Sequence, residues 1–573
     1  MRLNEWLLNE APSKRFALFT RSNAAEVMGE PLSPLGWTLI WKSAFGPGTW
    51  DGYVALGGFD REEFSESDSI YGAFGGYFYL NLSAMLILTA RMPGADPHQL
   101  AAAFDSDPAM PGYVAEPWHE NPEASTRLSA TLQSILAGRV PSELGALQDD
   151  AHAIRAARPD LAAQSLEALV ARMRSIVPAM RRNGQMHVHT GQAGMTAMGY
   201  LQTLLGGLGR GDDMARLCAG IGHVETADIA GQMWRLSRLV RATPGLSDAL
   251  RERRVDGYTP AFREAFAAFL YDHGARGSNE WDLVGATFET HPENALALIE
   301  SMVKQDDNAE PGAAQRRNGE VRDALLAEFD NMPAARDVRS AAEAVAAWFA
   351  ARERSKNLCV RVVHEARMCA EEIARRLMPS GEIGRREHVY MLQESELADF
   401  AADPAAFRER LAERYDTYLE VARREPPFIV NGAYPPPETW PLRAEPAARP
   451  EAALGERLKG LACSPGRVTG RARIVHDPAD PGLLEPGDIL ITATTNPSWT
   501  PLFLVAAAVV TEFGLFNSHA SIVSRELGIP CVASVPGVTS RIQNGALIAV
   551  DGDTGEIEIM AAPESTSAES AAA

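Results

Sequence analysis

The chain has 573 residues, of which 46% are hydrophobic and 23% are charged, so it can bury several cores, and global disorder is excluded. Its 54 basic and 75 acidic residues give a net charge of −21, which disfavours nucleic acid and anionic membranes as partners. The five cysteines form no CxxC pair, which predicts reduced thiols, a cytoplasmic location and no structural metal site.

The sequence predicts neither a signal peptide nor a membrane span. The first ten residues, MRLNEWLLNE, carry two acidic residues where a signal peptide needs a basic region. The longest later apolar run, residues 502–510, is too short to cross a bilayer. We therefore expect a soluble protein with no membrane partner.

Residues 1–430 are expected to form one mainly α-helical domain. Up to about residue 125, glycine, proline and aromatic residues alternate, which predicts short strands and loops that lead into helices. From residue 126 onward, apolar residues recur every three or four positions among Ala, Leu, Arg and Glu, a pattern typical of amphipathic helices. The string MHVHT, with His187 and His189, breaks this pattern. Its alternation favours a strand, and no carboxylate or cysteine completes a metal site there.

A second, smaller domain is expected after a proline-rich segment. Residues 431–456 are predicted to be an interdomain linker, because proline stiffens the chain and removes hydrogen-bond donors. Residues 457–562 then alternate β-branched runs with turns and contain one convincing helix, SHASIVSRELG, which predicts a compact domain of strands and helix. Residues 563–573 lack core-forming side chains and are expected to be a disordered tail. Six runs are predicted as strands: RVTGRARIVHD, GDILITATT, AAVVTE, CVASV, ALIAVDGD and EIEIM.

His519 is the strongest candidate for chemistry in the smaller domain. It is predicted in the first turn of a helix that Asn517 or Ser518 caps, where backbone N–H groups can stabilise a phosphoryl group on the ring. Neutral imidazole is a good nucleophile near pH 7. From local chemistry alone, however, a capped surface histidine is the more frequent situation.

The string SHASIVSRELGIPCV, with TTNPSWTPLF before it, resembles the swivelling phosphohistidine domain of the phosphoenolpyruvate (PEP)-utilising enzymes over about residues 458–560. In this family the histidine of the Ser-His-Ala string receives a phosphoryl group from a nucleotide-binding domain and carries it to a second site. The resemblance implies that His519 is this carrier and that Ser518 and Arg525 stabilise the phosphate. The sequence departs from the family's glycine- and threonine-rich loop at residues 513–517, which implies a more apolar loop.

The helical body is similar to the substrate domain of rifampicin phosphotransferase and of phenylphosphate-synthase-type proteins. The resemblance rests on strings that occur in the family's order between residues 18 and 430. They are FTRSNAAEVMGEPLSPLGW, FGGYFYLNLS, LCAGIGHVETADIAGQMWRL, FLYDHGARGSNEWDL and RERSKNLCVRVVHEAR. The resemblance makes residues 1–430 the acceptor-binding domain and implies that Trp37, Asn81, His273 and Arg276 contact the substrate. A loop held together by its own salt bridges is an equally good interpretation of the last two.

Helical periodicity independently selects one stretch of this body. Trp348, Arg352, Lys356, Cys359 and Val363 fall on one stripe, so two long cations are placed where a helix faces the interior. Buried cations need anionic partners, and a phosphoryl group would serve. The alternative is a helix edge with snorkelling basic side chains. In the resembling family this string lines the acceptor site, which implies that Arg352 and Lys356 bind the phosphoryl group and that Glu353 takes the acceptor proton.

Together these features predict the phosphohistidine and acceptor-binding subunit of a two-protein, ATP-dependent phosphotransferase. A separate ATP-grasp protein is expected to hold ATP and Mg²⁺ and to phosphorylate His519. The acceptor is expected to be a small aromatic alcohol or phenol, because aromatic residues such as Trp37 and Trp41 cluster near the matched strings. A plain hydrophobic core is the more frequent explanation of such a cluster. Two alternatives stay open: a rifampicin-type antibiotic phosphotransferase component and a noncatalytic, dikinase-like regulatory subunit.

Overall fold

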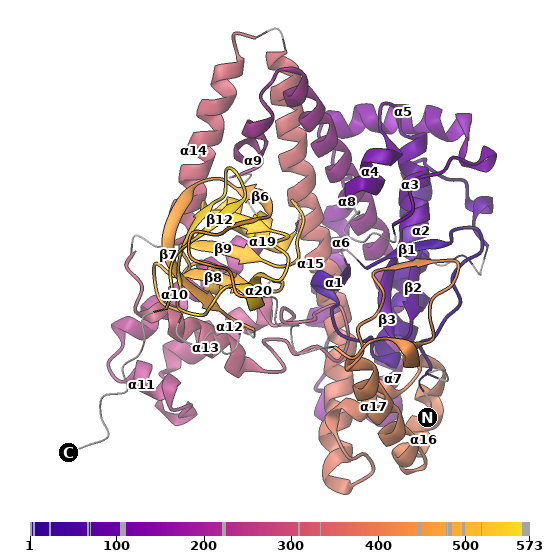
Figure 1. The fold of residues 1–573 in the computed structure, drawn as a ribbon. Helices are drawn as coiled ribbons and strands as arrows, with labels where there is room; N and C mark the ends of the chain where they lie inside the picture. The colour runs from indigo at the N-terminus through magenta and orange to yellow at the C-terminus, as the bar shows by residue number, and fades with distance from the viewer. Residues whose placement is uncertain are drawn as a thin grey trace. The chain divides into compact units, whose positions relative to one another are not determined.

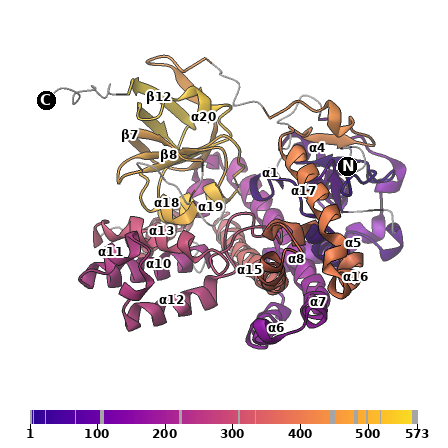
Figure 2. The ribbon, with the colours of Figure 1, turned by 90° about the horizontal axis from the view of Figure 1, so that it is seen from below.

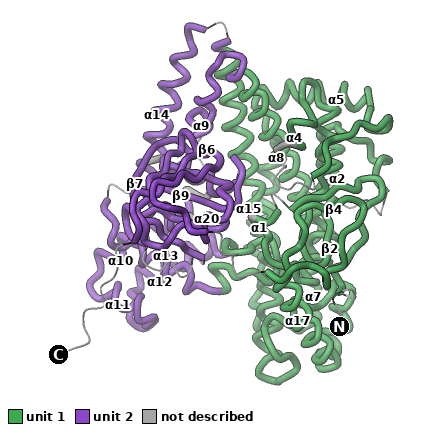
Figure 3. Tube along the Cα trace, in the orientation of Figure 1, with its two compact units in different colours: residues 1–204, 275–290, 336–443 green, residues 205–274, 291–335, 444–573 purple. Residues whose placement is uncertain are grey.

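The computed structural model describes most of the chain, and two compact units emerge from it (Figure 3). Unit 1 consists of residues 1–204, 275–290 and 336–443, and unit 2 of residues 205–274, 291–335 and 444–573. The expected boundary at residue 430 therefore does not coincide with the division into units, because two helical segments of the body cluster with the C-terminal segment. The described residues are 3, 6–21, 24–65, 68, 70–103, 110–219, 225–307, 310–332, 334–443, 450–476, 478, 484–495, 499–516 and 518–563.

Unit 1 is built mainly from helices around a large aromatic and aliphatic core (Figure 1). Its central element is the 46-residue helix α15 (Ala335–Ser380), whose stripe of apolar residues is the periodicity seen in the sequence. A small antiparallel sheet has the strand order β2-β3-β1-β4. Its strands are β1 (Leu18–Thr20), β2 (Tyr71–Phe74), β3 (Tyr77–Asn81) and β4 (Ile429–Asn431). The other helices are α1 (Ala24–Val27), the π-helix η2 (Gly36–Phe45), α2 (Gly46–Ala55), α3 (Leu82–Arg91), α4 (Pro97–Ala103), α5 (Pro122–Leu136), α6 (Glu143–Ala156), α7 (Leu166–Ser175), most of α8 (Val177–Gly207), α16 (Leu397–Ala402) and α17 (Arg408–Ala422).

The proline-rich segment is packed on unit 1 as far as residue 443. Strand β4 pairs with β1, and Trp440 is buried with its ring 6.2 Å from that of Tyr77. Gly75 allows this packing, since its φ is +54° and a Cβ there would lie 2.0 Å from the Trp440 ring. The expected linker is therefore wrong for residues 431–443, where aromatic side chains outweigh the proline signal. Residues 444–449 lie outside the described part of the chain.

Unit 2 combines a mixed eight-stranded sheet with helices from the middle of the chain (Figure 2). The strand order is β5-β12-β11-β7-β8-β9-β10-β6, and β7 to β10 run parallel to one another. Six strands and the helix α19 confirm the sequence-based prediction, whereas β5 and β6 were not predicted. The strands are β5 (Arg457–Lys459), β6 (Leu461–Ser464), β7 (Arg467–Ile474), β8 (Ile489–Thr492), β9 (Ala508–Thr511), β10 (Cys531–Ala533), β11 (Leu547–Asp551) and β12 (Glu556–Ala561).

The helices of unit 2 come from three segments of the chain. The short helices α18 and α19 pack against α10, and α19 also packs against α14. Figure 2 shows α18 and α19 on the side of the sheet that faces α10 and α13. The helices are α9 (Met214–Leu217), α10 (Glu225–Ala242), α11 (Leu246–Arg251), α12 (Pro260–His273), α13 (Pro292–Val303), α14 (Pro311–Phe329), α18 (Thr500–Phe503), α19 (His519–Leu527) and α20 (Val538–Arg541).

Two further expectations concern thiols and membranes. All five cysteines are buried free thiols, as predicted. Within the described ranges, no helix combines the length and the apolar character needed to cross a bilayer. The expected disordered tail lies outside the described residues from residue 564 onward.

The packing of residues 431–443 predicts a loss of stability for Trp440→Ala. Removing a buried tryptophan side chain leaves a cavity beside Tyr77, so the free energy of unfolding of unit 1 should fall by about 3–5 kcal/mol in urea denaturation. Glu438→Gln, an exposed position in the same segment, is the matched control and should leave it within about 0.5 kcal/mol. Equal, small effects of both substitutions would mean that this segment does not contribute to the fold.

Candidate functional site

His519 lies at the carboxyl ends of parallel strands in unit 2, where α/β sheets place their ligand sites. It is the first residue of α19, which follows β9, while Thr495 follows the neighbouring strand β8. The Thr495 Oγ1 atom lies 2.9 Å from the Nδ1 atom of His519. The Phe503 ring packs edge-on against the imidazole, with 5.8 Å between the ring centroids. The imidazole is therefore held in one orientation from two sides.

The loop between β9 and α19 depends on a glycine. Gly514 has a φ of +151°, and a Cβ there would lie 3.1 Å from the Ser518 Oγ atom and 3.2 Å from the Ala533 Cβ atom. Ser534 fixes the same loop by donating its hydroxyl hydrogen to the Gly514 carbonyl oxygen at 2.5 Å. These contacts set where the chain enters α19 and hence where His519 starts the helix.

The two residues expected to stabilise phosphate are both engaged within the domain. Ser518 is the N-cap residue of α19 but makes no capping hydrogen bond, and its Oγ atom lies 3.1 Å from that of Ser521. Arg525 is buried and donates to the carbonyl oxygens of Cys463 (3.0 Å) and Phe516 (2.7 Å). Arg525 therefore ties β6 to the loop before His519, and its expected contact with phosphate stays a prediction. Asn517, the alternative cap, lies outside the described residues.

A buried basic cluster lies in unit 1, where the stripe on α15 faces the interior. Lys356 is buried, and its Nζ atom is 3.5 Å from the Glu280 carboxylate. Arg276 donates from Nε to the same carboxylate at 2.8 Å and is buried as well. Burial raises the pKa of Glu280, but Arg276 and Lys356 outweigh it and hold this pKa below its usual range. One carboxylate thus compensates two buried cations.

The remaining two residues of the Arg-Glu-x-x-Lys string pair with each other. Arg352 donates from a terminal nitrogen to Glu353 Oε1 at 2.8 Å. Glu353 is buried, whereas Arg352 is only half-buried, so the predicted interior position is confirmed for Lys356 and only in part for Arg352. Arg352, Glu353, Lys356 and Arg276 all belong to unit 1. Glu280 supplies the anionic partner that the burial of Lys356 on this helix requires.

His187 adjoins this cluster, although the sequence analysis gave it no role. It lies on helix α8, not on a strand, and its Nδ1 atom is 3.2 Å from the Ser355 Oγ atom of α15. Burial, together with the charges of Arg352 and Lys356, lowers the pKa of His187 to about 3. The ring is therefore neutral at pH 7. The alternation in MHVHT concealed a helix because the neighbouring residues, not this string, carry the helical period.

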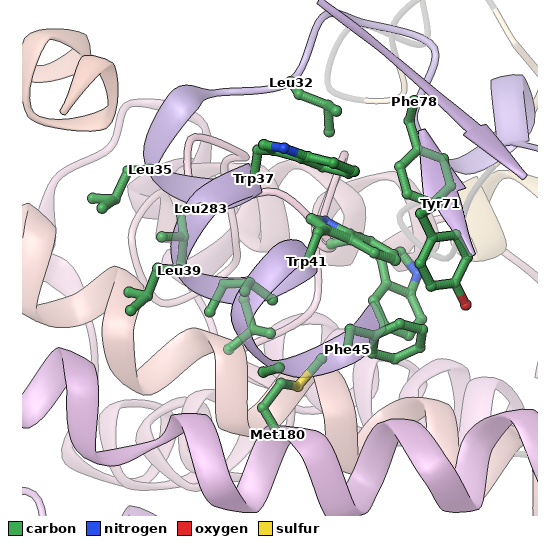
Figure 4. Packing of buried hydrophobic residues seen from close by; sticks show 14 of the residues in the cluster. Leu32, Leu35, Trp37, Leu39, Trp41, Phe45, Tyr71, Phe78, Met180 and Leu283 are labelled. Atoms are coloured by element: carbon green, nitrogen blue, oxygen red, sulfur yellow. The ribbon is translucent and has the colours of Figure 1, made fainter. Parts of the chain in front are cut away.

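Aromatic side chains pack together in the core of unit 1 (Figure 4). Trp281 packs against His187, with 5.5 Å between the ring centroids, and against Phe45 and Trp41 at 5.4 and 5.8 Å. The Trp41 indole N–H is buried and has no hydrogen-bond partner among the described residues. An unsatisfied buried donor costs about 1–3 kcal/mol, which a bound oxygen atom would remove.

Two residues expected to bind substrate are used by the fold itself. The Asn81 side chain caps α3 by accepting from the Ala84 N–H group at 3.0 Å and donates to the Phe16 carbonyl oxygen at 3.2 Å. The Trp37 indole donates to the Glu10 carboxylate at 3.1 Å. Asn81 is thus a helix cap, and Trp37 is a core residue whose indole N–H group has a partner. Their expected contacts with substrate stay predictions.

His273 does not share a unit with the other expected substrate residues. It ends α12 in unit 2, where its Nε2 atom lies 3.3 Å from the Asp228 carboxylate of α10. The contact lowers the pKa of Asp228 through a hydrogen bond from the imidazole. His273 therefore connects two helices of unit 2, whereas the ion pair within the string itself is the one between Arg276 and Glu280. Within the described ranges, no group of three or more His, Cys, Asp or Glu side chains could hold a metal ion.

Comparison with known proteins identifies both parts of the chain. Residues 484–555 match the family "PEP-utilising enzyme, mobile domain", and residues 186–354 match "Rifampicin phosphotransferase fourth domain". The prodigiosin synthesizing transferase PigC of Serratia marcescens is 30% identical over 374 residues, which cover 61% of this chain and 41% of PigC. Rifampicin phosphotransferases of Streptomyces sviceus and Bacillus subtilis are 31% and 26% identical, over 54% and 61% of this chain.

The chain therefore contains the mobile domain of the PEP-utilising enzymes, and His519 lies within it. It also contains a rifampicin phosphotransferase fourth domain, and its homologues include rifampicin phosphotransferases and PigC. The matched regions cover 41%, 35% and 42% of the lengths of PigC and of the Streptomyces and Bacillus enzymes. The resemblance to the rifampicin phosphotransferases predicted from the sequence is confirmed.

The burial of His187 predicts a pH dependence of stability. Its pKa is about 3 in the folded chain and near 6.5 when unfolded, so only the unfolded chain binds this proton between those values. Stability should therefore be lost as the pH falls below about 6.5. His187→Gln should remove this contribution, which is at most about 1.4 kcal/mol per pH unit.

Urea denaturation of unit 1 between pH 4.5 and 7 measures this difference. The exposed residue His98 supplies the matched control, and His98→Gln should keep the wild-type dependence. A wild-type slope that persists in His187→Gln would show that this histidine is not buried in its neutral form.

Proposed function

We propose that this chain is the phosphohistidine-relay and acceptor-binding component of an ATP-dependent phosphotransferase. The observation that carries the proposal is His519, which begins α19 at the carboxyl ends of β8 and β9 in a PEP-utiliser mobile domain. The free N–H groups of a helix start and its positive dipole end favour a doubly charged phosphoryl group at this position.

The first step forms a phosphohistidine. The Nδ1 atom of His519 lies 2.9 Å from the Thr495 Oγ1 atom. In the tautomer with the proton on Nδ1, that N–H group donates to Thr495 and leaves the lone pair on Nε2, so we assign the attack on phosphorus to Nε2. A P–N bond forms as the P–O bond to the donor's leaving phosphate breaks. ATP with Mg²⁺ supplies this phosphoryl group, and the resemblance to the family favours an ATP-grasp protein or domain as its source. Thr495 and Phe503 fix the ring for an in-line attack.

The second step delivers the phosphoryl group to a hydroxyl in unit 1. The acceptor oxygen attacks phosphorus while the P–N bond breaks, and His519 returns to its neutral form. Lys356 and Arg352 compensate the charge on the phosphoryl oxygens. We assign the uptake of the hydroxyl proton to Glu353, as the resemblance to the family implies, because the Glu280 carboxylate is already bound between Arg276 and Lys356.

The acceptor is proposed to be an aromatic molecule of antibiotic type. The aromatic cluster of Trp41, Phe45 and Trp281 supplies an apolar contact surface, and the Trp41 N–H group can donate to an oxygen of the acceptor. The names of the relatives, two rifampicin phosphotransferases and a prodigiosin synthesizing transferase, favour a large acceptor over the small phenol expected from the sequence.

Labelling of His519 tests the relay. With ATP, Mg²⁺ and an ATP-grasp protein of this family, the chain should acquire an acid-labile, base-stable phosphoryl group, measured with γ- and β-labelled ATP. His519→Ala should abolish the label. His476→Ala removes an exposed histidine of the same domain and should retain it. Equal labelling of the wild type and His519→Ala would place the carrier elsewhere, and an unlabelled wild type would favour a noncatalytic regulatory subunit.

Lys356→Ala tests the division of the reaction between the units. His519 phosphorylation should persist, whereas transfer from phosphohistidine to the acceptor should slow by roughly a hundredfold or more, as expected for one lost charge-stabilising contact. Arg354→Ala changes an exposed cation two residues away on the same helix and is the matched control.

Single-turnover release of the label measures transfer, with rifampicin and p-cresol as competing acceptors. Equal loss of both half-reactions in Lys356→Ala would contradict a role confined to transfer. Preferential transfer to p-cresol would restore the small-phenol interpretation.

A further inference from the structure

Helix α19 carries His519 at its first turn and is held at its other end by a residue from a distant segment. The Asn318 side chain, on α14, donates from Nδ2 to the carbonyl oxygens of Arg525 (2.6 Å) and Glu526 (3.0 Å). Asn318 lies in the residues that match the rifampicin phosphotransferase fourth domain, and α19 lies in those that match the mobile domain. Both belong to unit 2.

The two carbonyl groups belong to the last turn of α19, where carbonyl groups lack the usual i+4 partner of a helix. The Arg525 carbonyl also accepts from the Gly528 N–H group at 3.3 Å. Gly528 ends α19 with a φ of +66°, and its N–H group turns back toward Arg525 and Ser524. A Cβ at Gly528 would lie 2.8 Å from the Asn318 Oδ1 atom. A residue without a side chain therefore lets the amide approach the helix end.

A second contact between the same regions involves the surroundings of His519. Phe503, whose ring packs against the imidazole, belongs to α18, and α18 packs against α10 and α13. Both ends of the phosphohistidine site are thus in contact with fourth-domain helices, which form a docking face made of α10, α13 and α14.

We propose that Asn318 is a latch that holds the mobile domain on this docking face by recognising the C-terminal end of α19. The proposal rests on the relay proposed above, because a domain that visits two sites needs a contact that is specific yet readily broken. Two amide-to-carbonyl hydrogen bonds meet this need. Water replaces them when the domain leaves, so each changes the docking equilibrium by only about two- to tenfold.

The matched control is an ion pair between the same regions. Arg216 lies 3.4 Å from Asp553, but both side chains are about half exposed, so the pair contributes little. Arg216→Ala should therefore leave docking unchanged. Asn318→Ala removes the donor, and Asn318→Asp places a negative charge against the negative end of a helix, which should weaken docking further.

Pulsed electron–electron spin resonance measures docking without any turnover. Spin labels at Val321→Cys on α14 and Met560→Cys on β12 occupy exposed positions, and the native thiols are buried. We expect the ratio of docked to undocked populations to fall by about tenfold in Asn318→Ala and by more in Asn318→Asp. The Arg216→Ala variant should match the parent pair. Identical distance distributions in all four proteins would overturn the latch.

The two half-reactions give a readout that a purely structural role would not change. Loss of the latch should alter the ratio of His519 phosphorylation to phosphoryl transfer by about tenfold, whereas simple destabilisation would lower both together. Unchanged melting of the Asn318 variants by circular dichroism separates the two cases. If wild-type His519 is never labelled, the relay fails, but the distance measurement still decides whether Asn318 holds the domain.

Discussion

The burial of two cations beside one carboxylate sets the arrangement of unit 1. Glu280 contacts both Lys356 and Arg276, and removing one partner of a buried ion pair costs several kcal/mol. Glu280 reaches them because residues 275–290 belong to unit 1, although the helices before and after them belong to unit 2. The segment 275–290, which enters unit 1 between two segments of unit 2, is therefore fixed by an ion pair with Lys356, a cation that we assign to phosphoryl transfer.

Helix α15 holds the segment 275–290 in place through hydrogen bonds from its side chains. Arg367, fully buried, donates to the carbonyl oxygens of Glu280 (2.8 Å), Asp282 (2.7 Å) and Leu283 (3.1 Å). His364, one turn earlier, contacts Glu289 at 2.7 Å. Three turns of one helix thus hold both the backbone and the side chains of the segment. A long helix with paired charges along one face would support the acceptor site that we propose, because positioning of a phosphoryl group requires fixed side chains.

Features that depend on the local spacing of hydrophobic residues could be predicted from the sequence. Contacts between residues that lie far apart in the chain could not. The stripe of α15, six strands and the helix begun by His519 follow from hydrophobic spacing alone. Glu280 could be inferred only as an unnamed anion, because nothing in the spacing links it to Lys356, 76 residues later. The contacts of Asn81 and Trp440 were missed for the same reason. Asn81 donates to the Phe16 carbonyl oxygen and Trp440 packs on Tyr77, and both partners are distant in the sequence.

The polarity of α19 explains why one short helix can serve both chemistry and docking. Its N-terminus favours the negative phosphoryl group on His519, while its C-terminus offers carbonyl oxygens to a donor. The two ligands do not compete, because they occupy opposite ends of nine residues. Lysine or arginine at position 318 would complement the negative end more strongly than asparagine. The neutral amide of Asn318 instead binds the end of α19 specifically but weakly. Weak binding suits the relay that we propose, in which the domain must leave to deliver its phosphoryl group.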